Sequence, residues 1–159
     1  MVAGAHYVEM TLLEKGGYGA WMGVVGQSFD VAGGRAASSS AEGWLLDTDG
    51  GCLYHAGWDS YWQGMPQGGE IKQGDVVGLL LDLGQRTLSV YLNGARRGVM
   101  VAPGMKNSEN GEAVAPLAGP LRWAAEVGGG GSVRIERRPP PPEVAAAVAR
   151  NEGGHCIVQ

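Results

Sequence analysis

The feature that most constrains this chain is a strand–turn–strand pattern centred on Asn93-Gly94. Residues 87–92 alternate between apolar and polar side chains, as a half-buried strand does. Asn-Gly favours a type I′ turn because both central positions need positive φ. Residues 95–101 then pair back on this strand, and the apolar run 75–82 has the length of a third strand. We expect three residues of the central strand to face the core: Leu88, Val90 and Leu92.

Other short β-prone stretches follow the same pattern along the chain. Turn residues such as Asp49-Gly50 and the glycines 128–131 separate them. The chain has 29 glycines in 159 residues, and an interior glycine costs a helix roughly 0.5–1 kcal/mol relative to alanine. The sequence therefore predicts an all-β sandwich or barrel. Further strands are expected at 6–13, 20–25, 43–47, 52–55, 121–127 and 132–137.

The prolines at 139–142 end the β pattern because proline cannot join a sheet ladder. We therefore predict one domain over residues 1–138 and a Pro/Ala-rich tail over residues 139–159. Within the tail, residues 143–150 are Ala-rich and have the composition of one short helix.

The charge and the cysteine content limit the partners and the cellular location that we expect. The net charge is −4 and no long basic run occurs, so neither nucleic acid nor an anionic membrane is an expected partner. Cys52 is expected in a strand and Cys156 in the tail, so no structural disulfide is predicted and a reducing, cytoplasmic location fits best. The first residues lack the basic and apolar regions of a signal peptide.

A series of short motifs runs in order along roughly residues 4–137. The motifs are Tyr7-Val8-Glu9, Gly43-Trp44, Asp49-Gly50, Leu53-Tyr54-His55, Gly74-Asp75-Val76-Val77-Gly78, Leu81-Asp82, Thr87-Leu88-Ser89-Val90-Tyr91, Asn93-Gly94, Gly98-Val99, Gly119-Pro120-Leu121 and Ser132-Val133-Arg134-Ile135. Together they resemble the core signature of SPRY domains. The resemblance implies a bent antiparallel two-sheet β-sandwich of the concanavalin-like jelly-roll type, with no catalytic site. It also implies that loops at one edge bind a short peptide or a protein surface.

Three long loops, near residues 27–40, 56–66 and 104–112, hold the candidate partner-binding residues. Aromatic and arginine side chains on irregular loops are the usual hot spots of interfaces. Each tryptophan on these loops has the alternative of folding back to cap the core, whereas Trp21, Trp44 and Trp123 are interpreted as core residues. The candidates are Phe29, Asp30, Arg35, Trp58, Tyr61, Trp62, Lys106 and Asn107.

Catalytic, metal and cofactor sites are not predicted. Cys52 and His55 are three residues apart on one predicted strand, so their side chains point to opposite faces. The glycines 128–131 are interpreted as a strand connection, since no Lys-Ser/Thr follows them.

The end of the chain, Cys156-Ile157-Val158-Gln159, fits a prenylation pattern. A membrane partner is expected only if Cys156 is lipidated, and an unmodified tail is the alternative.

The predicted function is an adaptor or substrate-recognition module that binds a protein or peptide. Two alternatives remain open at this point. Trp58, Tyr61 and Trp62 have the side chains that stack on sugar rings, as in a carbohydrate- or small-ligand-binding sandwich. A structural subunit, whose open sheet edge is completed by a neighbour, is the other.

Overall fold

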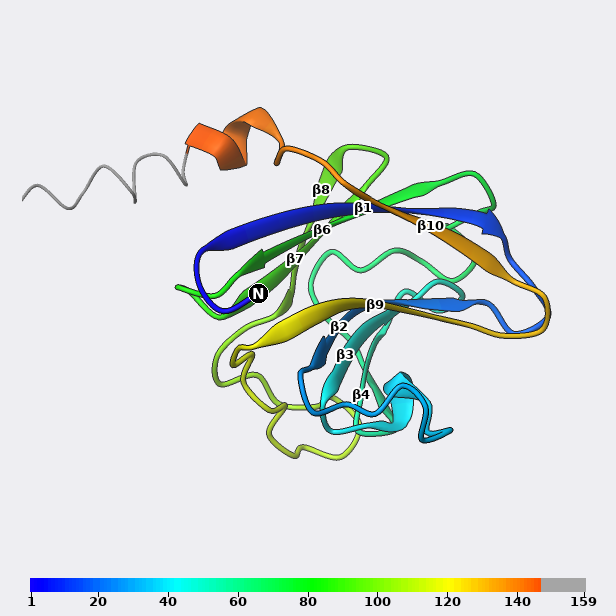
Figure 1. Ribbon diagram of the computed structural model, residues 1–159, viewed down its shortest axis with the longest axis horizontal. Helices are drawn as coiled ribbons and strands as arrows, with labels where there is room; N and C mark the ends of the chain where they lie inside the picture. The colour runs from blue at the N-terminus through cyan, green and yellow to red at the C-terminus, as the bar shows by residue number, and fades with distance from the viewer. Residues whose placement is uncertain (147–159) are drawn as a thin grey trace, which may run out of the picture.

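Ten strands form two antiparallel sheets in the computed structural model, which describes residues 1–146 (Figure 1). Sheet A has the order β10-β1-β6-β7-β8 and sheet B the order β5-β4-β3-β2-β9. The predicted all-β two-sheet sandwich is therefore confirmed. The strands are β1 (Ala5–Glu14), β2 (Ala20–Gly26), β3 (Gly43–Asp47), β4 (Leu53–His55), β5 (Trp58–Ser60), β6 (Val76–Asp82), β7 (Thr87–Leu92), β8 (Ala95–Val101), β9 (Leu121–Val127) and β10 (Ser132–Arg137), with a 3₁₀ turn η1 (Ala37–Ser39) before β3.

The Asn93-Gly94 turn joins β7 to β8 with φ of 50° and 82°, which confirms the predicted type I′ conformation. The Asn93 side chain also fixes the neighbouring hairpin. Its Oδ1 accepts a hydrogen bond from the Val76 amide at 2.9 Å, and its Nδ2 donates one to Asp75 Oδ1 at 3.0 Å. The turn therefore holds the start of β6 in register with the end of β7.

The core lies between the sheets, where one face of each strand is buried. Val8, Met10 and Leu12 on β1 face it, as do Met22 and Val24 on β2. The inward row predicted for β7 is confirmed as well, because all three members are buried in the same cluster: Leu88, Val90 and Leu92.

A second, smaller cluster lies on the outer face of sheet B and includes Val25, Ala37 and Leu45. Trp21 packs against this cluster and makes an edge-on contact with Tyr54, with ring centroids 6.2 Å apart. Trp21, interpreted as a core residue, thus packs on this smaller cluster and not between the sheets, because alternate residues of β2 face opposite sides of the sheet.

Strand β5 was not predicted; residues 58–60 were expected to be loop. It pairs with β4 through a two-residue turn at Ala56-Gly57, whose φ values are 56° and 82°. Alanine rarely adopts positive φ, so the turn carries no sequence signal of the Asn-Gly kind. The loop assignment of residues 58–60 is corrected to an edge strand.

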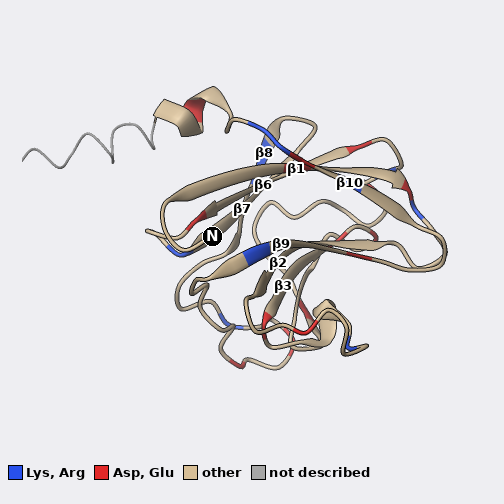
Figure 2. Ribbon diagram, viewed as in Figure 1, with Lys and Arg blue, Asp and Glu red and all other residues tan. Residues whose placement is uncertain are grey.

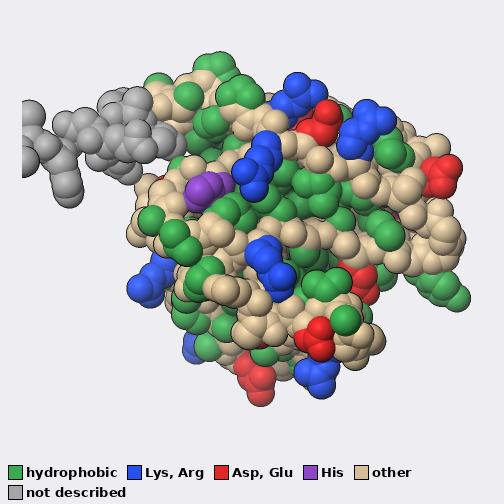
Figure 3. Space-filling model, viewed as in Figure 1, with side chains coloured by type: hydrophobic (Ala, Val, Ile, Leu, Met, Phe, Trp, Pro, Cys, Tyr) green, Lys and Arg blue, Asp and Glu red, His purple; other side chains and the backbone are tan. Residues whose placement is uncertain are grey.

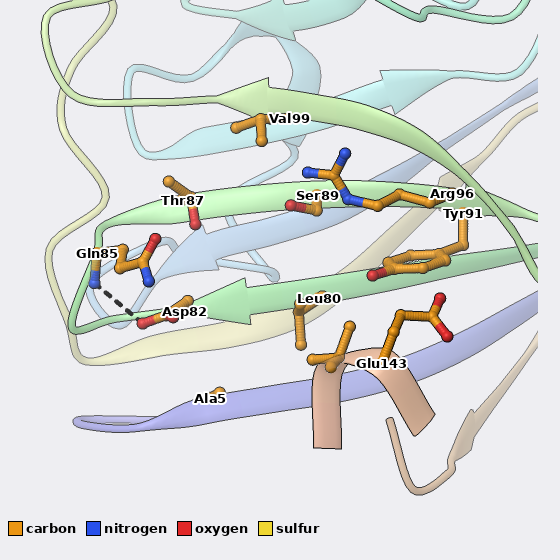
Figure 4. A pocket seen from close by; sticks show the side chains of 11 residues that line it. Ala5, Leu80, Asp82, Gln85, Thr87, Ser89, Tyr91, Arg96, Val99 and Glu143 are labelled. Carbon is orange, nitrogen blue, oxygen red and sulfur yellow. Dashed lines mark hydrogen bonds between the residues drawn. The ribbon is translucent and has the colours of Figure 1, made fainter. Parts of the chain in front are cut away.

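The start of the predicted tail packs on the outer face of sheet A. Residues 142–146 are helical, and Glu143 and Val144 line a hollow of about 290 Å³ together with Tyr91 and Arg96 (Figure 4). Tyr91 is fully buried there and contacts Tyr7 edge-on. The remainder of the predicted tail and helix, including Cys156, lies outside the described residues. No helix within residues 1–146 is long and apolar enough to cross a membrane.

Candidate functional site

Three connections meet at one end of sheet B, at the lower end of the molecule in Figure 1. They are residues 27–42 between β2 and β3, residues 56–57 between β4 and β5, and residues 102–120 between β8 and β9. The first two are joined by backbone hydrogen bonds of 3.1 Å, from Ala56 N to Ser40 O and from Gly57 N to Ser38 O. We refer to this region as the loop end.

Loop 102–120 is fastened to sheet B by Trp44 and His55. Trp44 Nε1 donates to Ala115 O at 2.8 Å, and the Ala115 amide donates to His55 Nε2 at 3.3 Å. His55 Nδ1 donates to Gly43 O at 2.8 Å, and the imidazole stacks on the Trp44 ring with centroids 5.2 Å apart. These two hydrogen bonds require the neutral imidazole of His55, because Nε2 must accept a hydrogen bond from the Ala115 amide while Nδ1 donates one to Gly43 O. Burial lowers the His55 pKa, opposed in part by the hydrogen bond to Gly43.

The same loop is also tied to β5. The Tyr61 amide donates to Ser108 Oγ at 2.9 Å, and the Ser108 amide donates to Ser60 Oγ at 3.0 Å. Asn107 is buried, and its Nδ2 donates to Asp59 O at 3.2 Å. These bonds fix the position of the loop relative to the exposed aromatic residues beside it.

The three neighbouring aromatics predicted as one group differ in their exposure to solvent. Trp62 is only 7% exposed and its Nε1 donates to Gly51 O at 2.9 Å, so it belongs to the framework. Trp58 is 49% exposed and Tyr61 is 58% exposed. These two side chains, and not Trp62 or the buried Asn107, are available to a partner.

The first loop forms a shallow hollow of about 250 Å³. Phe29 is half-buried and packs against the smaller cluster of sheet B, while Asp30 Oδ1 accepts from the Ala32 amide at 2.9 Å and shapes the turn. Arg35 is exposed and forms no ion pair with any described residue. The residues lining the hollow are Phe29, Asp30, Gly33, Arg35, Ser40 and Glu42.

Sequence reasoning missed contributors to the loop end. Val31 is strongly exposed on the first loop, next to predicted Asp30. Arg122 on β9 supports that loop, since its guanidinium donates to Gln27 O at 3.1 Å and Phe29 O at 2.8 Å. Val31 could have been recognised in the sequence, because an apolar residue is unusual inside a Gly/Ala-rich loop. The role of Arg122 could not, because its contacts join residues more than 90 positions apart. Lys106 is exposed and bridges to Ala113 through its backbone.

Cys52 and His55 do not form a pair of nucleophile and general base. Cys52 is buried, and its Sγ donates to Gly50 O at 3.8 Å, while both ring nitrogens of His55 are occupied as described above. Burial, with the nearby carboxylates of Asp59 and Asp47, raises the Cys52 pKa and so keeps the thiol protonated. In residues 1–146, no group of three His, Cys, Asp or Glu side chains is placed to hold a metal ion.

Comparison with known proteins supports the fold. Structural comparison finds similarity to the SPRY domain of human HERC1, with a TM-score of 0.60 and 19% identity over 86% of this chain and 77% of that one. No protein-family model matches the sequence. No curated protein matches it either. The sandwich is therefore SPRY-like, as the order of motifs suggested.

Proposed function

We propose that this domain is a protein-interaction module that binds a short peptide or a protein surface at the loop end. The observation that carries the proposal is the exposure of Trp58 and Tyr61 beside a loop that is tightly hydrogen-bonded to the scaffold. Large aromatic side chains held on a fixed support lose little conformational entropy on binding, and they dominate interface energetics. A SPRY-like fold, whose members are in general interaction modules, agrees with this proposal.

The loop end offers two kinds of contact to a partner. Trp58 and Tyr61 provide apolar area, and the hollow of the first loop adds Arg35, whose guanidinium has no carboxylate partner in the described chain. An extended peptide with an apolar anchor and a carboxylate fits this combination. Binding of this kind suits an adaptor or a substrate-recognition domain, and it requires no chemistry from the domain itself.

A displayed peptide library tests the proposal. Selected peptides are then measured against Trp58→Ala and Arg35→Ala, and we expect affinity to fall by about tenfold or more for the tryptophan variant, as for an interface hot spot. Tyr18→Ala is the matched control, because Tyr18 is 73% exposed but lies in the β1–β2 turn, at the other end of β2. Melting curves of each variant confirm that it is folded.

Two results would contradict the proposal. Peptides that bind both variants as well as the wild type do not use the loop end. Stabilisation of the domain by members of a glycan panel, with no peptide selected, favours the carbohydrate-binding alternative instead.

A further inference from the structure

The sandwich is open on the flank where the edge strands β9 and β10 lie. Cross-strand partners share a face, so Val133, Ile135 and Arg137, which pair with Leu12, Met10 and Val8, point inward between the sheets. By the same reasoning Trp123, Ala125 and Val127 on β9 point inward from sheet B. Ile135 is nevertheless 45% exposed and Val127 44% exposed. We call this region the open flank.

The opposite flank shows what a covered edge looks like in the same molecule. There the edge strand β8 has Met100 and Val101 fully buried, because loop residues pack over the space between the sheets. The covering side chains include Trp62, Ile71 and Leu117. In the described part of the chain, no comparable segment covers β10 and β9. Exposed apolar side chains that are grouped on one edge of a core are typical of an interaction surface.

Unpaired arginines lie on the open flank of a chain whose net charge is −4, whereas Glu136, the acidic residue of β10, is ion-paired with Arg138. Arg137 continues the inward row of β10, whereas Arg134 and Arg122 stand on the outer faces of the two edge strands. None of these three arginines has a carboxylate partner among the described residues; Arg122 hydrogen-bonds only backbone carbonyls. Figure 3 shows the result as a hydrophobic band between the sheets with blue side chains on both sides, and Figure 2 shows an arginine on β9 itself.

The backbone at this flank is suited to pairing. β10 is the last strand of sheet A and β9 the last of sheet B. The edge of β9 already accepts extended chain at one point: Leu121 N donates to Met1 O at 2.9 Å, and the Met1 amino group donates to Leu121 O at 2.6 Å. Beside this contact, a hollow of about 500 Å³ lies between Trp123, His6 and Arg137.

We propose that the open flank binds an extended peptide segment of a partner protein in which apolar and acidic residues alternate. The segment adds a strand to the free edge of β10. Its apolar side chains enter the space between Ile135 and Trp123, and its carboxylates, which alternate with them, lie on the outer face beside Arg134. Strand addition of this type takes its affinity from main-chain hydrogen bonds and its specificity from alternate side chains.

Fluorescence anisotropy with a labelled peptide of about eight residues, alternating glutamate with valine or isoleucine, tests the inference on the full chain. We expect saturable binding that weakens as NaCl is raised from about 0.05 to 0.5 M, because salt screens exposed charges. The same peptide with lysine replacing glutamate is expected not to bind. Amide hydrogen exchange in the wild-type complex should slow in β10 and leave the loop end unchanged.

Variants separate this site from the loop end. Arg134→Glu and Ile135→Asp are each expected to weaken binding tenfold or more, while the matched changes Lys106→Glu and Val31→Asp, both on exposed loop residues, leave it unchanged. Equal binding of the lysine peptide, no binding of either peptide, or protection outside β9 and β10 would overturn the inference. So would a dimer in sedimentation that Ile135→Asp dissociates, since a second copy would then be the occupant.

Discussion

His55 gives the sharpest test of how loop 102–120 is held. Replacing it by alanine leaves Gly43 O and the Ala115 amide without their partner and removes the stack on Trp44. A buried polar group left unpaired costs roughly 1–3 kcal/mol, and an aromatic contact contributes about 0.5–1.5 kcal/mol. Allowing for water entering at the loop, we expect His55→Ala to lower the free energy of unfolding by about 3 kcal/mol.

The same residue predicts the pH dependence of stability. The folded-state pKa of His55 lies below its usual value near 6.5, so the unfolded chain binds the proton more readily. The contribution of neutral His55 is complete above about pH 6.5 and is lost as the pH falls toward the folded-state pKa. The loss has a slope of at most about 1.4 kcal/mol per pH unit.

Urea unfolding followed by tryptophan fluorescence at pH 5.5, 6.5 and 7.5 measures both effects. The wild type should lose stability over this range on acidification, and His55→Ala should show a flatter profile from a lower starting value. His6→Ala, at a half-buried position near the N-terminus, is the control and should keep the wild-type slope. If His55→Ala loses stability on acidification as steeply as the wild type, His55 is not the responsible group.

Three further predictions concern the scaffold. Gly23→Ala should destabilise the domain by about 3 kcal/mol in urea, because a Cβ there would lie 2.0 Å from Trp44 O; a loss below about 0.5 kcal/mol would mean that the strands separate freely. Asn93→Ala should cost about 1–2 kcal/mol, since alanine is strained at φ of 50°, and Asn93→Gly should cost less; the opposite order would argue against the turn geometry. In a Cys156→Ser background, Cys52 should react with iodoacetamide only on unfolding, because burial raises its pKa; rapid alkylation of the folded protein would refute this.

The strands were predictable because their pattern is local. Alternation alone assigned the inward row of β7, and Asn93-Gly94 fixed the turn after it. Strand β5 was not predicted because the turn before it has no recognisable turn residue at its first position. Ala56 adopts a positive φ there, which an alanine in the sequence does not predict. When a turn residue adopts a conformation that its type disfavours, the sequence does not predict the hairpin that the turn forms.

The loop end was predictable only in outline, because burial on an irregular segment depends on distant residues. Tyr61 and Trp62 are neighbours in the sequence, yet only Trp62 finds a buried acceptor, Gly51 O. Asn107 is likewise committed to Asp59 O. No periodicity distinguishes such residues from exposed ones on a loop, so the sequence placed them all in one candidate group.

The open flank and the loop end share one residue, Arg122. Its guanidinium hydrogen-bonds the backbone of residues 26–29 in the first loop, while its strand, β9, forms one wall of the open flank. A carbonyl-bound arginine keeps its charge, so the group that positions the first loop also contributes positive potential to the flank. A fixed contact therefore joins the two proposed binding surfaces of the sandwich. Because Trp58 and Tyr61 lie on a different edge from the row formed by Ile135 and Arg137, both proposed surfaces can be occupied at once.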